Sequence, residues 1–296
     1  MTRVENGDHM KKILVVIVLL LLIAYVLFSQ CSDAGICSLR DHQRMQEGST
    51  PKHRIGVNYI IGRSSKTDDV TYHTARIDGR FSIFEGAEVS LLLPFNAQSG
   101  PLGDVSGLGD IIVVWNQEVV GNNDLLLKLQ IGAKFASGNA NEDPSLPQLY
   151  QSGLGSNDIL LGATVSYDQW DGTIGYQIAG GRSSNTITRL QRSDDFLLRA
   201  GYVHRIDRFV LHPSLLFIQR LGNSSVANSS YPAGPEFIEL SDSAPSQLNL
   251  QIDGSYSFSG IYSAEASIAL PFLKRKMNVD GLTRAITLSF GVFVVL

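Results

Sequence analysis

The chain has 296 residues, with 44% hydrophobic and 18% charged side chains and a formal net charge of −4. That charge excludes the broad basic surface of a nucleic-acid-binding protein, so no nucleic-acid partner is expected. After residue 30 the chain shows almost no helical periodicity, which argues against a soluble helical or α/β enzyme. The sequence contains no phosphate-binding, zinc or dinucleotide motif, so neither a metal nor a cofactor is expected.

An apolar segment at residues 13–29 opens the chain, directly after Lys11 and Lys12. This order predicts a secretory signal peptide over residues 1–30, in which residues 1–9, before Met10, are interpreted as an over-extended start. The alternative is an uncleaved transmembrane anchor, because the segment just reaches the length of a spanning helix. Residues 31–52 extend over roughly 80 Å at most, too short to link an inner-membrane helix to an outer-membrane domain, and this favours cleavage.

Two cysteines, Cys31 and Cys37, lie in the linker predicted over residues 31–52, which is placed in the periplasm. In an exported chain, a disulfide between two such close cysteines is the ordinary expectation. The alternative is that Cys31 is the lipid-modified first residue of a mature lipoprotein. The preceding residues 28–30 fit that cleavage pattern poorly, so both hypotheses stay open.

From residue 53 onward, apolar and polar side chains alternate with a period of two, which is typical of β-strands with one apolar face. The pattern predicts twelve strands, at residues 55–61, 75–83, 87–95, 111–118, 124–136, 159–167, 173–180, 196–202, 209–217, 247–258, 262–270 and 282–296. The connections alternate between short turns and long loops. The fold class is therefore predicted to be all-β, as a closed antiparallel 12-stranded transmembrane β-barrel over residues 53–296.

A soluble barrel with an apolar core would show the same alternation. The strand lengths and the confinement of charges to one face or to loops favour a membrane barrel in the bacterial outer membrane, with lipid and the barrel-insertion machinery as partners. Aromatic residues also cluster at the strand ends, as interfacial girdles do. They are Phe81, Phe84, Tyr167, Trp170, Tyr256, Phe258 and Tyr262 near short turns, and Tyr72, Phe95, Phe135, Phe217 and Phe272 near long loops.

The chain ends in a pattern that is typical of the C-terminal insertion signal of outer-membrane proteins, carried by Ser289, Gly291, Val294 and Leu296. An aromatic residue is usual at the last position, and Leu296 departs from it.

Two Leu-Pro-Phe strand ends, at residues 93–95 and 270–272, and two Gly-Leu-Gly strand openings, at residues 107–109 and 153–155, resemble the family "MetA-pathway of phenol degradation", a group of barrel-forming transporters. The resemblance covers residues 53–296. It implies an outer-membrane channel or transporter, for hydrophobic or aromatic compounds, and it names no catalytic residue.

If the apolar faces contact lipid, the opposite faces line the lumen. The charged candidates on these faces are Arg54, Arg76, Arg80, Lys128, Lys134 and Arg199, together with Asp78, Glu88, Glu118, Asp158, Asp253 and Glu265. Confined charges are expected to pair, because an unpaired charge loses much of its hydration. The result is interpreted either as an ion-paired filling that holds the barrel rigid or as a polar eyelet that selects solutes.

His212 and Ser214 share one face, a spacing that nucleophilic catalysis could use. They are expected to face the lumen near a short turn, and Pro213 between them interrupts the strand ladder. A hydrogen-bonded lumen histidine is therefore predicted, and no catalytic residue. Asp110, Asp124 and Asp158 could bind Ca²⁺ weakly, although their place beside strand starts fits ordinary turn chemistry equally well.

Three hypotheses for function follow. The first is an outer-membrane channel or transporter for a small solute. The second is a plugged structural or adhesive barrel that acts through its extracellular loops. The third and most remote is a membrane-embedded lipid hydrolase.

Overall fold

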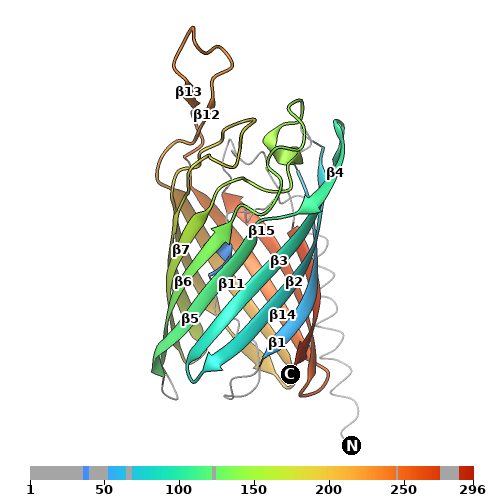
Figure 1. Ribbon diagram of the computed structural model, residues 1–296. Coiled ribbons are helices and arrows are strands. Elements are labelled where there is room, and N and C mark those ends of the chain that lie inside the picture. Colours follow the sequence, from blue (N-terminus) through green and yellow to red (C-terminus); the bar gives the residue numbers. More distant parts are fainter. Residues whose placement is uncertain (1–35, 40–52, 65–68, 122–124, 245, 274–286) are drawn as a thin grey trace, which may run out of the picture.

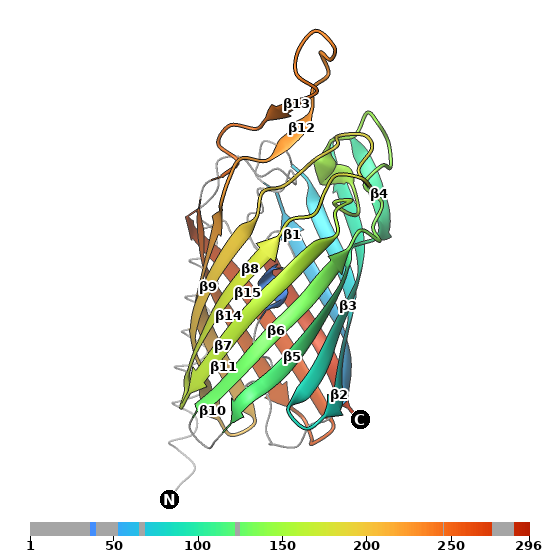
Figure 2. The same cartoon turned by 60° about the vertical axis from the view of Figure 1, so that its left-hand side comes forward.

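The structure, a computed structural model, describes residues 36–39, 53–64, 69–121, 125–244, 246–273 and 287–296. Within these ranges, twelve long strands form one closed antiparallel barrel, as predicted (Figures 1 and 2). The strands are β1 (Arg54–Arg63), β2 (Thr71–Phe84), β3 (Ala87–Gly100), β5 (Ile111–Gly121), β6 (Leu125–Phe135), β7 (Asp158–Tyr167), β8 (Trp170–Ile178), β9 (Asp195–Tyr202), β11 (Phe209–Arg220), β14 (Gln247–Ser257), β15 (Tyr262–Leu273) and β16 (Thr287–Val295).

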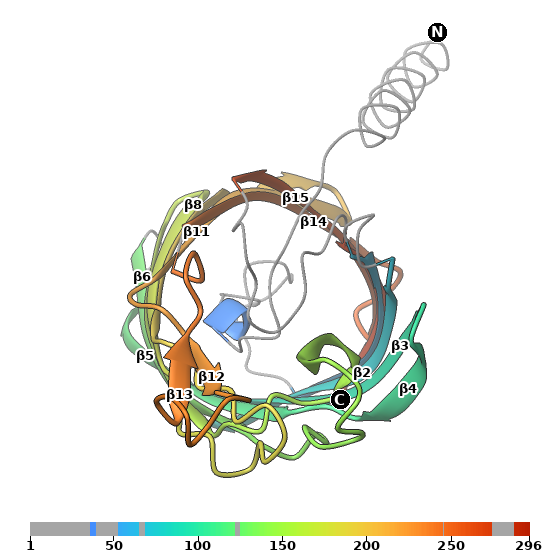
Figure 3. The same cartoon turned by 90° about the horizontal axis from the view of Figure 1, so that it is seen from above.

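Each long strand pairs with the long strand before it, and β16 pairs with β1 to close the ring. Seen along its axis, the barrel is a complete circle (Figure 3). Closure leaves no sheet edge, so the wall satisfies its own backbone hydrogen bonds, as a structure inside a lipid bilayer must.

The connections sort by length to the two ends of the barrel, which confirms the predicted alternation. Short turns join β2 to β3 and β7 to β8 at one end, where Gly86 and Asp168 have positive φ angles of 74° and 50°. Glycine and aspartate tolerate this left-handed conformation. The long loops gather at the opposite end (Figure 1). These ends are called the short-turn end and the long-loop end below.

Four short strands complete the fold. β4 (Gly103–Leu108) pairs with the outer part of β3, and β10 (His204–Ile206) pairs with the start of β11. β12 (Ser225–Ala227) and β13 (Phe237–Glu239) form a hairpin that stands above the long-loop end (Figure 1). Two short 3-10 turns are described as well, η1 (Ile36–Ser38) and η3 (Gln148–Tyr150).

The outer face of the barrel is apolar and the inner face is mostly polar. On β7, for example, Ile159, Leu161 and Val165 are exposed on the outside, while Asp158 and Thr164, at alternating positions, are buried. An apolar exterior of this kind suits contact with lipid. Among the described residues, no helix is both long and apolar enough to cross a membrane. The apolar segment 13–29 and the predicted signal peptide lie outside the described residues.

Most of the aromatic residues expected at the strand ends lie on the exterior, including Trp170 at the short-turn end and Phe272 at the long-loop end. Tyr72 is an exception, and its prediction was wrong. It points inward, is 4% exposed, and packs in a cluster with Val70 and Tyr150. Its even-numbered position on β2 places it on the same face as Arg76 and Asp78, so the period of two outweighs its aromatic character.

Candidate functional site: the barrel lumen

A short piece of the N-terminal region lies inside the barrel. The η1 turn is seen within the ring when the barrel is viewed from above (Figure 3). The backbone N–H of Ile36 donates to Oε1 of Gln177 on β8, at 3.1 Å. The guanidinium of Arg199 on β9 donates to the carbonyl oxygens of Leu39 and Cys37, at 3.3 and 3.4 Å. The sequence predicts a periplasmic linker over residues 31–52, but the part of it that is described, residues 36–39, occupies the lumen.

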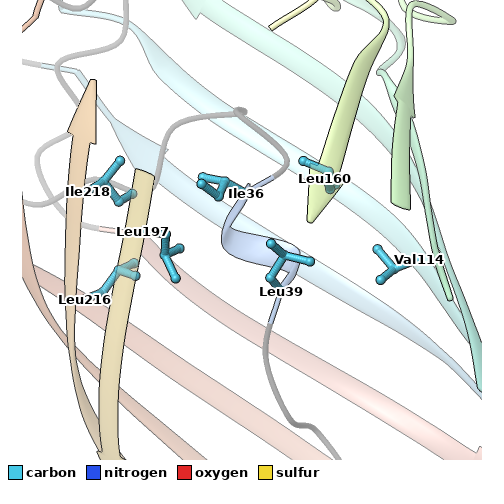
Figure 4. Close-up of a cluster of buried hydrophobic side chains, with 7 residues drawn as sticks. All are labelled: Ile36, Leu39, Val114, Leu160, Leu197, Leu216 and Ile218. Carbon is cyan, nitrogen blue, oxygen red and sulfur yellow. The ribbon is translucent and has the colours of Figure 1, made fainter. Parts of the chain in front are cut away.

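Ile36 and Leu39 are fully buried in an apolar cluster on the inner wall (Figure 4). The wall contributes one residue from β5, one from β7, one from β9 and two from β11, here called the apolar patch: Val114, Leu160, Leu197, Leu216 and Ile218. These positions face inward, where the alternation otherwise places polar residues. Inward-facing leucines on strands with an apolar outer face were therefore a signal of the patch in the sequence.

Cys37, beside this cluster, is in a disulfide. Its predicted partner Cys31 lies outside the described residues, so the choice between a disulfide and a lipid anchor at Cys31 stays a prediction.

A ladder of buried ion pairs runs from strand to strand along the inner face of the wall, near the long-loop end. Lys134 Nζ on β6 lies 3.0 Å from Asp158 Oδ2 on β7. Arg192, in the loop before β9, lies 3.8 Å from Asp158 and 2.6 Å from Asp195. Arg220 on β11 binds the same Asp195 oxygen at 3.1 Å. All five side chains are at most 1% exposed. Lys134 and Asp158 are among the predicted lumen residues, whereas the other three were missed.

Asp110, in the loop just before β5, joins this ladder. One of its carboxylate oxygens lies 3.4 Å from Lys134 Nζ, and the two oxygens accept the backbone N–H groups of Gly138 and Leu154. Burial raises the pKa of Asp110 above its ordinary value of 3.8, against the opposite effect of Lys134. The carboxylate thereby anchors the loop at residues 136–157 to the barrel rim. Within the described ranges, no group of three or more His, Cys, Asp or Glu side chains is arranged to hold a metal.

The loops above the ladder are joined into a cap. Asn185, in the loop before β9, donates to Oε1 of Gln148 and to the carbonyl oxygen of Leu154. Asn141 Oδ1 accepts the backbone N–H of Thr186 at 2.6 Å. Asn185 is fully buried. Two loops that are distant in sequence therefore act as one covering element over this side of the barrel.

His212 also lies on the inner wall, nearer the short-turn end. Its Nε2 lies 2.8 Å from Asp171 Oδ2 on β8, and its Nδ1 lies 3.9 Å from Asp253 Oδ2 on β14. To reach β8 the ring crosses β9 at Gly201, where a Cβ would lie only 2.2 Å from Nε2. His212 is thus the hydrogen-bonded lumen histidine that the sequence predicts.

The opposite side of the lumen holds two separate ion pairs. Arg54 on β1 binds Glu265 on β15 at 2.5 Å and stacks on the ring of Phe293, 3.7 Å from its centroid. Arg76 donates to Asp78 on the same strand at 2.5 and 2.8 Å. The Arg76 side chain is 22% exposed, in contrast to the buried ladder.

The inner face of the barrel is therefore divided. The closed wall comprises the inner faces of β6, β7, β8, β9 and β11, where the side chains are mostly buried; on β11 every inward position from Val210 to Arg220 is buried. The accessible wall comprises the inner faces of β2, β3 and β15, where most inward side chains are half-buried. On β3 the inward side chains from Glu88 to Asn96 are all half-buried, so they remain partly accessible.

The other predicted lumen residues are placed as follows. Arg80 and Lys128 are buried, Glu88 and Glu118 are half-buried, and Arg199 and Asp253 lie in the η1 and His212 groups described above. Of the predicted insertion signal, Ser289 and Gly291 face inward on β16. Ser289 shares a hydrogen bond with Ser267 at 2.6 Å.

No protein-family model matches the chain, and no curated protein matches its sequence. Among solved structures, the COG4313 outer membrane channel from Pseudomonas putida F1 is similar with a TM-score of 0.67 and 14% identity, over 87% of this chain and 100% of that one. The NanC porin gives a TM-score of 0.48 and 10% identity over 81% and 100%. The CymD monoaromatic hydrocarbon channel gives 0.45 and 11% over 92% and 98%. At 14% identity, the first likeness shows the outer-membrane barrel fold and not the solute.

Proposed function

We propose that this chain is an outer-membrane channel that passes a small solute along the accessible wall. The apolar exterior supports a place in a membrane, and the long-loop end then faces outward from the cell. The observation that carries the proposal is the division of the lumen. One side is filled by η1 and its contacts, while the side chains on β2, β3 and β15 keep part of their surface accessible.

The accessible wall combines charge with apolar surface. Arg76 lies opposite Pro94 in the β2–β3 register, and Asp78 lies opposite Leu92. An ion pair flanked by apolar side chains suits a solute that has both an apolar face and a hydrogen-bonding group. This agrees with the hydrophobic or aromatic solutes that the "MetA-pathway of phenol degradation" resemblance implies, and membership of that family is part of the proposal.

The charged lumen candidates are proposed to serve two roles. Those on the accessible wall, such as Arg76, Asp78 and Glu265, form the polar eyelet. Those on the closed wall, such as Lys134 and Asp158, hold the wall rigid. No catalysis is proposed: the His212 ring lies between two carboxylates, with Nε2 2.8 Å from Asp171 and Nδ1 3.9 Å from Asp253.

Export and assembly complete the proposal. Residues 1–30 are proposed to direct export and to be cleaved, and the C-terminal strand is proposed to be recognised by the barrel-insertion machinery. The outer-membrane lipid then surrounds the apolar exterior.

One observation favours a second candidate, the plugged or adhesive barrel. The β12–β13 hairpin projects above the barrel and carries exposed apolar residues, including Tyr231 and Ile238. On this hypothesis η1 closes the lumen permanently and the hairpin contacts another molecule.

Single-channel recording in planar bilayers separates the two candidates. The purified protein is expected to conduct. Arg76→Ala removes the positive charge beside Asp78 and should shift the reversal potential toward cation selectivity, whereas Glu265→Ala removes the negative charge beside Arg54 and should shift it toward anion selectivity.

Arg63→Ala is the matched control, because Arg63 pairs with Asp69 at the exposed rim, where both side chains are more than half exposed (67% and 54%). It should leave selectivity unchanged. Heat-modifiable gel mobility verifies that each variant forms a barrel. A folded wild-type protein and folded variants that all fail to conduct would disprove the channel.

A further inference from the structure

The apolar patch is unusual for a wall that faces an aqueous lumen. Around it, the same wall carries Lys134, Gln177 and Arg199, all buried among polar partners. Five inward-facing apolar side chains from four strands would be costly to expose to water. The patch therefore implies an apolar occupant.

The patch also has a shaped seat. Gly162 on β7 and Gly175 on β8 lie opposite each other in register. A Cβ at Gly162 would lie 3.3 Å from Leu39 Cδ1, and a Cβ at Gly175 would lie 3.0 Å from the same atom. The absence of two adjacent side chains makes room for one branched apolar group against the wall.

In the structure, Leu39 occupies this seat, and Ile36 packs against the same apolar patch. The turn is held by the hydrogen bonds to Gln177 and Arg199. The backbone pairing of β7 with β8, β8 with β9 and β9 with β11 does not involve the turn. The wall is thus complete in itself, and the turn is bound to it as a ligand would be.

We propose that the apolar patch is a binding site for a small apolar or aromatic solute, and that residues 36–39 occupy it as an internal ligand which the solute displaces. The proposal rests on the channel function proposed above and names the chemistry of its solute. It also explains how a lumen lined largely by polar residues handles an apolar solute: the solute binds the patch, releases the turn, and so widens the passage beside the accessible wall.

Hydrogen–deuterium exchange of the full-length protein in lipid nanodiscs tests the displacement, with toluene as the probe. The amide of Ile36 donates to Gln177, so exchange in the peptide that contains residues 36–39 reports undocking. Toluene should accelerate exchange there severalfold and leave the β7 and β8 amides unchanged. Erythritol, a small polar solute, should have no effect. Unchanged exchange at saturating toluene would overturn the proposal.

Two variants on one strand locate the site. Leu216→Asn places a polar group in the patch and should abolish the toluene effect. Val210→Asn makes a similar change at an inward, buried position of β11 outside the patch and should preserve it. Equal responses from the two variants would contradict the assignment.

Ile36→Asn supplies an independent variant that leaves the barrel strands untouched. It should speed exchange without toluene and lower the toluene concentration needed for half-maximal effect. If Ile36→Asn leaves the toluene concentration unchanged, the turn does not compete for the site.

Conductance measured on the same preparations keeps the two proposals distinct. Conduction without a toluene effect would refute the binding site and leave the channel standing. A toluene effect without conduction would refute the channel and leave the binding site.

Discussion

The closed and accessible walls share the same alternation of inward and outward side chains, but they differ in how far the inward side chains are buried. On both, inward positions alternate with apolar outward ones. On the closed wall, β11 buries every inward side chain, and Asp195 is shared by two arginines from different segments. On the accessible wall, β3 leaves its inward side chains from Glu88 to Asn96 half-buried, and Arg76 pairs with Asp78 on its own strand.

The difference comes from elements outside the strands. Arg192 in the loop before β9 completes the ladder from above, and residues 36–39 fill the space below it. Inward polarity therefore tells only which way a strand faces. Whether that face is filled depends on what the loops and the N-terminal region place against it.

The largest expected contrast between the walls is in the cost of losing one carboxylate. Asp195→Ala leaves Arg192 and Arg220 without a shared buried partner, and should lower the free energy of unfolding by about 3–5 kcal/mol. Asp78→Ala acts on partly hydrated groups and should cost roughly 1–2 kcal/mol. Urea unfolding in detergent, followed by gel mobility, measures both. Equal losses would mean that the two walls do not differ energetically.

A smaller contrast is expected between two inward leucines. Leu216 is 1% exposed in the apolar patch, so Leu216→Ala should cost about 2–4 kcal/mol through lost contacts and a cavity. Leu92 is half-buried on the accessible wall, so Leu92→Ala should cost about 1 kcal/mol. The same unfolding assay compares them. A greater loss at Leu92 would show that the accessible wall is packed against something in solution.

The barrel could be predicted from the sequence because a strand with one lipid face repeats the same signal many times. Each of the twelve predicted strands overlaps an observed one, and within the described residues the predicted and observed ends differ by a few residues. The sorting of loops by length followed from the same count. Local alternation is sufficient for these features, since each strand pairs mainly with its neighbours in sequence.

The candidate site was predicted only in part, since its key contacts join distant segments. Lys134 and Asp158 were found from their place on strands, but Arg192 lies in a loop without periodicity. Asp195 and Arg220 stand at strand ends, just beyond the predicted bounds. The docking of residues 36–39 could not be predicted from sequence periodicity, because Ile36 and Leu39 pack against wall residues that lie more than 70 positions further along the chain.

The smallest expected effect concerns the hydrogen bond between His212 and Asp171, which bridges β11 and β8 across β9 near the short-turn end. In Gly201→Ala the new Cβ would meet His212 Nε2 at 2.2 Å, so the ring must leave Asp171. The lost buried hydrogen bond should cost about 1–3 kcal/mol. Gly172→Ala is the control, because its nearest neighbour would be Arg199 O at 3.8 Å, an ordinary contact. If the bridge is what Gly201 protects, then His212→Ala should remove most of the penalty of a second change to Gly201→Ala. If the losses in the free energy of unfolding from Gly201→Ala and His212→Ala are additive, the strain lies in the β9 backbone. The His212–Asp171 hydrogen bond would then not be what stabilises this part of the closed wall.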